Sequence, residues 1–247
     1  MLPYGTQSIS DDDINAVISV LKGDFLTQGP SVQEFEKNLA AYLNTPHAVS
    51  CANGTAALHV CALALELKPG DAVFLPAITF AATSNAVLYV GATPVFVDIE
   101  DETYGMCPNS LEKAYSLALQ KGLRPKAIFV VHYAGKPAQM EKIVAFARSH
   151  DLKIAEDACH ALGAEYRLST QDRFVKVGSS EFTDLTCLSF HPVKHITTGE
   201  GGAVSTSDPK LAEKLKMLCS HGITKNSASF LQNDRAYSEA GELNGWY

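Results

Sequence analysis

The sequence predicts an α/β protein, a three-layer αβα domain built on a mainly parallel sheet. Short apolar runs alternate with amphipathic segments along most of the chain. Capping residues precede several of the amphipathic segments, and glycines or polar residues follow several of the apolar runs. Repeated strand–helix alternation calls for a mainly parallel sheet with helices on both faces. Ligands bind such sheets at the carboxyl ends of the strands, so the residues after each strand are the candidates for a site.

The helices are predicted from their caps and from their amphipathic spacing. Ser10 begins the first helix and Gly23 stops it, whereas Ser31 with Glu34 has the pattern of a capping box that opens the second. Asp208 caps the last helix. The expected helices cover residues 10–22, 31–42, 55–67, 80–90, a segment that opens at 109, 137–150 and 208–219.

The strands are predicted from short apolar runs, several of them rich in β-branched residues. They cover residues 47–51, 72–75, 94–99, 126–132, 153–155, 186–190 and 202–206. The run at 153–155 continues directly into Glu156 and Asp157. The polar segment 168–176 is expected to be a loop, and residues 224–247 form an Asn/Ser/Gly-rich tail with little periodicity.

Composition narrows the class of protein. The 247 residues carry a formal net charge of −7, and 46% of them are hydrophobic, which is typical of a globular chain with a sizeable core. Without a Lys/Arg stripe we expect no nucleic-acid partner, and without a long apolar run we expect no membrane span. The N-terminus lacks the features of a signal peptide, so a cytoplasmic location is expected. The six cysteines fit no zinc module and are expected to be reduced, and no metal site is expected.

Two segments that follow strands open helices and have residues suited to a flat, phosphorylated ligand. In the first, Gly54 and Thr55 lie at a helix start, where backbone N–H groups can approach a phosphate and the hydroxyl can assist. A simple tight turn before a helix explains this segment equally well. In the second, Phe80 is placed to stack on a heteroaromatic ring, although taken alone it reads more readily as a core residue.

A third segment places a carboxylate after a buried strand. Asp157 can hold the ring nitrogen of pyridoxal phosphate (PLP) in its protonated form, which makes the ring an electron sink. His160 lies close enough in sequence to hydrogen-bond Asp157 or the phenolic oxygen of the cofactor. Helix capping by Asp157 and a satisfied, partly buried His160 are the plainer interpretations of each residue alone.

The fourth segment has one lysine between an apolar strand and a glycine cluster. We expect desolvation of Lys194 to lower the pKa of its amine, so that the neutral nucleophile can form a Schiff base with an aldehyde cofactor such as PLP. Ser189 lies five residues earlier, where it can bind a phosphate oxygen of the same cofactor. The four segments together indicate a PLP site, since each supplies a different group that PLP requires.

These residues resemble the DegT/StrS-type PLP-dependent sugar aminotransferases, which have fold type I. The motifs that carry the resemblance are Leu26-Thr27-Gln28-Gly29, Gly54-Thr55-Ala56-Ala57-Leu58, Thr79-Phe80, Glu156-Asp157-Ala158, and Lys194 with Gly199-Glu200-Gly201-Gly202. The resemblance implies that Lys194 is the catalytic residue, which bonds PLP as a Schiff base and later moves the proton. It also implies that Gly54, Thr55 and Ser189 bind the phosphate and Asp157 the pyridinium. Phe80 is expected to stack on the ring, and His160 to support the ring oxygen.

Within the family, the chain looks most like the aminotransferases of pseudaminic acid biosynthesis. The pointers are Tyr133-Ala134-Gly135-Lys136, Ser189-Phe190-His191 and Ser220-His221-Gly222. This resemblance implies that an amino group passes from L-glutamate to C4 of a UDP-linked 4-keto-6-deoxy-N-acetyl sugar. Tyr4 and Thr27 are then expected beside the sugar nucleotide, and a homodimer is expected because family active sites lie at a dimer interface.

The resemblance also sets the domain expectation. Residues 1–222 would be the PLP-binding large domain, and residues 223–247 a polar tail leading to a C-terminal small domain that this chain lacks. Three alternatives stay open: another nucleotide-sugar 3- or 4-aminotransferase, a sugar dehydratase of the same fold, and a non-catalytic fragment that binds PLP or a partner subunit. Lys194 argues against the dehydratase, because relatives of that kind have histidine in its place.

Overall fold

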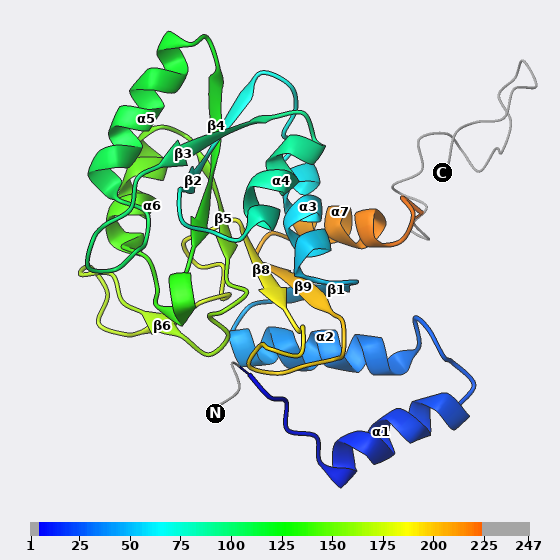
Figure 1. Ribbon diagram of the computed structural model, residues 1–247. Coiled ribbons are helices and arrows are strands. Elements are labelled where there is room, and N and C mark those ends of the chain that lie inside the picture. Colours follow the sequence, from blue (N-terminus) through cyan, green and yellow to red (C-terminus); the bar gives the residue numbers. More distant parts are fainter. Residues whose placement is uncertain (1–4, 224–247) are drawn as a thin grey trace, which may run out of the picture.

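A seven-stranded sheet lies at the centre of the molecule in the computed structural model, which describes residues 5–223 (Figure 1). Its strands are β1 (His47–Cys51), β2 (Asp71–Pro76), β3 (Thr93–Val97), β4 (Arg124–Val131), β5 (Lys153–Asp157), β8 (Leu185–Ser189) and β9 (Gly202–Thr206). Their order across the sheet is β1-β9-β8-β5-β4-β2-β3. All neighbours pair in parallel except β9, which is antiparallel to both β1 and β8. The predicted, mainly parallel sheet is confirmed.

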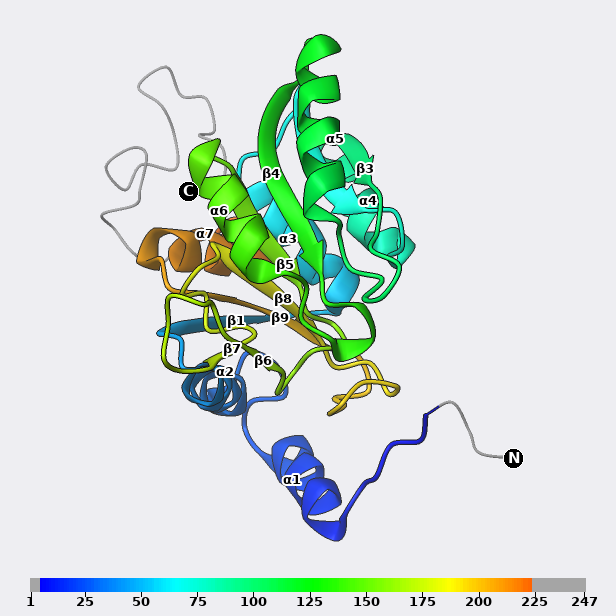
Figure 2. The ribbon, with the colours of Figure 1, turned by 90° about the vertical axis from the view of Figure 1, so that its left-hand side faces the viewer.

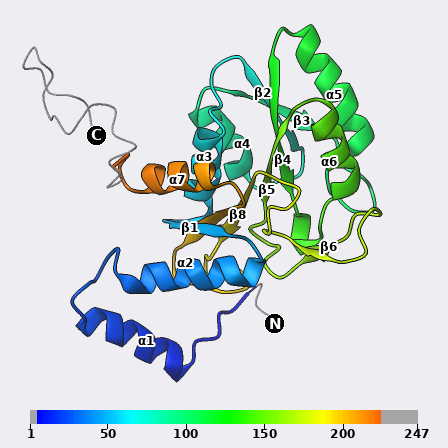
Figure 3. The same cartoon turned by 180° about the vertical axis from the view of Figure 1, so that it is seen from behind.

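Two apolar clusters, one on each face of the sheet, make the three layers. On one face lie α2 (Pro30–Leu43), α5 (Pro108–Gln120) and α6 (Met140–Ser149); on the other lie α3 (Gly54–Ala64), α4 (Ala81–Tyr89) and α7 (Pro209–Cys219). Strand β4 contributes Ile128 and Val130 to the first cluster and Ala127 and Phe129 to the second. Its side chains therefore alternate between two buried faces, as expected for a central parallel strand. Figure 3, from behind, again shows α5 and α6 on one side of the strands and α3 and α7 on the other.

The first helix, α1 (Asp11–Lys22), stands clear of the sheet, below α2 in Figure 2. Its predicted start is confirmed: the Ser10 hydroxyl accepts from the Asp13 N–H at 3.2 Å, and the Asp13 carboxylate accepts from the Ser10 N–H at 2.8 Å. Gly23 is the C-cap, also as predicted. None of the twelve residues of α1 is buried. The capping residues of α1 therefore define a helix that buries none of its faces.

The capping box predicted at Ser31 and Glu34 is wrong. Helix α2 begins at Pro30 with Gly29 as its N-cap, and no side chain caps it. Proline suits the first turn of a helix because it has no N–H to satisfy and its φ is already helical. The proline therefore starts the helix before the serine, and Ser31 falls inside the first turn. The far end is set by Asn44, which adopts the left-handed conformation at φ 58°.

Several other predicted boundaries differ from the structure: α3, for example, ends at Ala64 rather than at 67, and β3 ends at Val97 rather than at 99. Helix α6 begins at Met140 rather than at 137, because residues 133–135 form the short 3-10 helix η1 (Tyr133–Gly135) and Gln139 is the N-cap. The segment predicted as a loop at 168–176 ends in a strand, β7 (Val175–Lys176), which pairs antiparallel with β6 (Glu165–Tyr166). Such two-residue strands are too short for a periodicity to reveal them.

The six cysteines all lie within the described residues, and all are free thiols, as predicted. Across residues 5–223, no helix combines the length and the apolar character needed to cross a membrane.

Candidate active site

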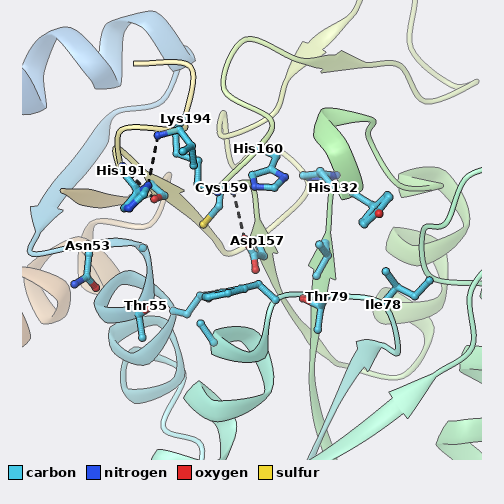
Figure 4. A pocket seen from close by; sticks show the side chains of 18 of the residues that line it. Asn53, Thr55, Ile78, Thr79, His132, Asp157, Cys159, His160, His191 and Lys194 are labelled. Carbon is cyan, nitrogen blue, oxygen red and sulfur yellow. Dashed lines mark hydrogen bonds between the residues drawn. The ribbon is translucent and has the colours of Figure 1, made fainter. Parts of the chain in front are cut away.

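A cavity of about 710 Å³ opens at the carboxyl ends of the strands (Figure 4). Its size is within the range typical of small-molecule pockets. The lining comes from the segments that follow β1, β2, β4, β5 and β8: Asn53, Gly54, Thr55, Leu58, Ile78, Thr79, Phe80, Ala82, Val131, His132, Tyr133, Asp157, Cys159, His160, Ser189, His191, Val193, Lys194 and Glu200. The four segments singled out from the sequence therefore meet in one pocket.

Asp157 lies at the floor of this pocket, at the last position of β5, and is buried. Its Oδ2 accepts a hydrogen bond from the Thr83 hydroxyl at 2.7 Å, and its Oδ1 accepts from the Cys159 N–H at 3.3 Å. Thr83 in turn lies 2.7 Å from the Thr79 hydroxyl. A buried carboxylate needs such donors, and these fix its orientation toward the pocket.

The start of α3 forms a second wall. The Asn53 side chain caps the helix by accepting from the Ala56 N–H at 2.9 Å. The first N–H groups of a helix have no partner within it, and in α3 this end faces the cavity at Gly54 and Thr55. Such an end favours an anion. A Cβ at Gly202 would lie 2.4 Å from the Asn53 carbonyl oxygen, so close packing requires a glycine at this position of the predicted cluster.

Lys194 lies in the turn between β8 and β9, as predicted, and its side chain reaches the pocket. The turn is held by hydrogen bonds from the Lys194 N–H to the His191 carbonyl at 2.8 Å and from the Phe190 N–H to the Gly201 carbonyl at 2.8 Å. The side chain is half-buried, because the pocket is open beside it. The desolvation expected from the sequence is therefore only partial in this chain. Ser189, at the end of β8, also lines the cavity.

The remaining predicted cofactor residues lie around the mouth. Phe80, the N-cap of α4, is 77% exposed, so it is available for stacking and is not a core residue. His160 also lines the pocket. Burial and the nearby Lys194 ammonium lower the pKa of His160, which keeps the imidazole neutral at neutral pH.

His160 makes no hydrogen bond to Asp157 in this structure, contrary to one of the two roles expected for it. Both carboxylate oxygens of Asp157 are instead engaged by Thr83 and by the Cys159 N–H. The cause is the turn after β5, which presents its own backbone N–H to the carboxylate. The other expected role, at the ring oxygen of the cofactor, stays a prediction.

The two residues predicted to contact the sugar nucleotide are not brought to this pocket by the described chain. Thr27 lies exposed in the connection between α1 and α2 and does not line the cavity. Tyr4 lies outside the described residues. Both roles stay predictions.

Sequence reasoning missed a buried polar network beneath the pocket. The Nδ1 of His132 accepts from the Ala138 N–H at 3.1 Å, so the proton of a neutral ring lies on Nε2, which faces the Glu156 Oε1 at 3.4 Å. The other oxygen of Glu156 accepts from the Thr186 hydroxyl. His132 directly follows β4, so the rule about strand ends could have found it. Thr83 lies within a helix and gave no such signal.

An amine, a buried carboxylate, an exposed aromatic ring and a helix N-terminus thus share one pocket at the carboxyl edge of a mostly parallel αβα sheet. This combination defines the class: fold type I transferases, which hold PLP at that edge. The chain belongs to the DegT/DnrJ/EryC1/StrS aminotransferase family, whose sequence profile matches residues 7–240.

Individual relatives agree with this assignment. The chain is 40% identical to the UDP-4-amino-4,6-dideoxy-N-acetyl-beta-L-altrosamine transaminase of Campylobacter jejuni, over 91% of this chain and 56% of that protein. It is 38% identical to the spore coat polysaccharide biosynthesis protein SpsC of Bacillus subtilis, over 91% and 54%. The solved PLP form of Spr1654 of Streptococcus pneumoniae superposes with a TM-score of 0.79 at 30% identity, covering 90% of this chain and 59% of that one. The chain therefore spans about half the length of the relatives it matches.

Proposed function

We propose that the chain is the large-domain part of a PLP-dependent aminotransferase that acts on a nucleotide-linked keto sugar. The observation that carries the proposal is the meeting of Lys194, Asp157 and the start of α3 in one cavity. These groups come from three separate stretches of the chain, and each meets a different requirement of the cofactor.

The pocket fits PLP in three respects. The start of α3, with Gly54, Thr55 and the nearby Ser189, offers N–H and hydroxyl donors to a phosphate. The buried Asp157 offers an oriented acceptor to a protonated ring nitrogen. Phe80 offers an exposed aromatic face to the ring.

When bound, PLP supplies an electron sink for a carbanion next to nitrogen. The part of this chain in the reaction is to bind, to orient and to move protons. The Nζ of Lys194 is the nucleophile that holds the cofactor and, once released, takes and returns a proton. Thr83 keeps the carboxylate of Asp157 turned toward the ring position. His160, neutral at neutral pH, can accept or donate a hydrogen bond at the ring oxygen.

For the substrates we infer L-glutamate as amino donor and a UDP-linked 4-keto-6-deoxy-N-acetyl sugar as acceptor, as in pseudaminic acid biosynthesis. Similarity to the Campylobacter transaminase supports this choice. Nearly equal similarity to SpsC supports a second choice, in which the chain is another nucleotide-sugar 3- or 4-aminotransferase. Tyr4 and Thr27 are the proposed contacts to the sugar nucleotide.

We also propose that the working enzyme is a cytoplasmic homodimer with residues 1–222 as its PLP-binding large domain. Four side chains that line the pocket leave apolar surface exposed at its mouth: Ile78, Phe80, Tyr133 and Val193. A second subunit over this mouth would exclude water and complete the desolvation of Lys194. The free thiols are those expected of a reducing compartment.

The test is the visible spectrum of the purified chain with PLP, before and after L-glutamate. We expect a yellow band that bleaches with L-glutamate, and borohydride should fix the cofactor to Lys194. Lys194→Ala should lose transamination and the fixed cofactor while keeping its fold, whereas the exposed Lys210→Ala should match the parent. Transamination that survives in Lys194→Ala would overturn the assignment.

A chain that binds PLP without transferring an amino group is the second candidate, favoured by the half-length coverage of relatives. The same experiment separates the two, because that chain gives the yellow band but no bleaching. A complementing C-terminal fragment of a relative that restores bleaching would indicate that the large domain needs its partner.

A further inference from the structure

Two thiols lie beside the carboxylate at the floor of the pocket. Cys187 is on β8 and is the parallel register partner of Asp157 on β5, while Cys159 lies two residues after Asp157. The two sulfur atoms are 3.8 Å apart. One oxygen of Asp157 and the two sulfurs all lie within 4.8 Å of one another. Figure 4 shows the sulfur of Cys159 beside Asp157.

This arrangement has the dimensions of a metal site. Two bonds of about 2.3 Å from zinc to sulfur, set at the tetrahedral angle, place the sulfurs about 3.8 Å apart. The thiols of Cys159 and Cys187 already have this separation. The carboxylate oxygen of Asp157 lies within 4.8 Å of both sulfurs, and to share the ion it would have to move toward them and change its present hydrogen bond to Thr83. The fourth position would face the cavity, since Asp157 and Cys159 both line it. Three protein ligands and one open position are typical of accessible zinc sites.

The ligand types indicate which ion would bind. Thiolates select soft or borderline ions such as Zn²⁺ and Cd²⁺, whereas Mg²⁺ and Ca²⁺ prefer sites made only of oxygen. The spacing of the cysteines along the sequence did not predict this site, because the register of β5 and β8 brings residues 159 and 187 together. Ordinary packing of the buried Cys187 thiol against the half-buried Cys159 thiol is the competing explanation of the contact.

We propose that Asp157, Cys159 and Cys187 form a binding site for a thiophilic divalent cation, Zn²⁺ or Cd²⁺. Each thiol releases its proton to solvent as its sulfur bonds the ion, and the carboxylate contributes a lone pair, so nothing is oxidised or reduced. The ion takes the carboxylate that the cofactor ring also needs, so ion and PLP compete. The competition between the ion and PLP rests on the proposed function, because it requires that PLP bind at Asp157. The binding of the ion does not rest on that function.

The test titrates the reduced, cofactor-free chain with Cd²⁺ and follows the ultraviolet absorption of cadmium–thiolate bonds. We expect one ion per chain, and Zn²⁺ should displace it. Cys159→Ser and Cys187→Ser should each lose most of the absorption, and Asp157→Asn should weaken binding. Cys107→Ser, a half-buried thiol outside the cluster, is the matched control and should behave as the parent.

Absence of the absorption in the parent protein would overturn the ion site without any variant, and so would absorption that survives in both serine variants. Circular dichroism of each variant checks that it is folded. A second titration adds PLP to the Cd²⁺-loaded chain. A yellow band that forms while the ion stays bound would overturn the competition alone. A yellow band in a chain that takes up no Cd²⁺ would leave the proposed function standing and remove the ion site.

Discussion

The carboxyl edge of the sheet and the N-terminal helix α1 are built in opposite ways. At the sheet edge, the local sequence gives only weak signals for structure, because the chain turns abruptly after each strand. Asp157 and Thr83 are nevertheless buried there. In α1 the local signals are strong, with a complete capping box, yet no residue is buried. Its apolar stripe is exposed at Ile14, Val17, Ile18 and Leu21, by 39–63%. In α1, capping therefore decides where the helix begins, while at the sheet edge burial decides which segments assemble the site.

The largest expected change in the free energy of unfolding is for a substitution in the core behind the pocket. Phe129 is fully buried on β4, in the apolar cluster to which α3, α4 and α7 contribute. We expect Phe129→Ala to lower the free energy of unfolding by about 3–5 kcal/mol, because it removes apolar contacts and leaves a cavity. Urea denaturation of the two proteins measures this change. A loss below about 1 kcal/mol would mean that this side of the sheet is not tightly packed.

A smaller effect is expected where α3 meets β8 at the edge of the pocket. A Cβ at Gly54 would lie 2.9 Å from the Cβ of Ser189 and 3.2 Å from the sulfur of Cys159. Gly54→Ala should cost about 1–3 kcal/mol in urea denaturation through overpacking, and it should weaken PLP binding. Gly105→Ala is the matched control, since its Cβ would make only ordinary contacts at 3.5 Å or more. An equal change in the free energy of unfolding in the two variants would contradict the close approach of α3 to β8 at Gly54.

The smallest effect is expected in α1. Leu21 is 63% exposed, so Leu21→Ala should change the free energy of unfolding by less than about 0.5 kcal/mol. Urea denaturation at two protein concentrations measures it. A loss above about 1 kcal/mol would break the comparison, because it would show that the stripe of α1 is covered in solution.

The sequence sufficed for the order of the α-helices and of the strands of the central sheet along the chain, and for most of the segments that line the pocket, but β6, β7 and η1 were not predicted. Asp157 and Lys194 could be placed because each follows a strand that a buried apolar run reveals. The antiparallel direction of β9 could not be foreseen, since Gly202–Thr206 has the same pattern as a parallel strand. Thr83 was missed because its hydroxyl reaches Asp157 across 74 positions, and only tertiary packing brings them together. Thr27 was placed by resemblance alone, and no burial within this chain fixes its position.

The hydroxyl groups of Thr79 and Thr83 have a direction as well as a position. Asp157, when ionised, can only accept, so the single proton of Thr83 points at it. Thr83 is then left as an acceptor, and the proton on Thr79 must point toward Thr83. If a proton were to reach the facing oxygen of Asp157, both hydroxyls could rotate and the row would reverse its polarity. The hydroxyl directions of two uncharged side chains, Thr83 in α4 and Thr79 just before it, would in this way depend on whether the carboxylate holds its negative charge.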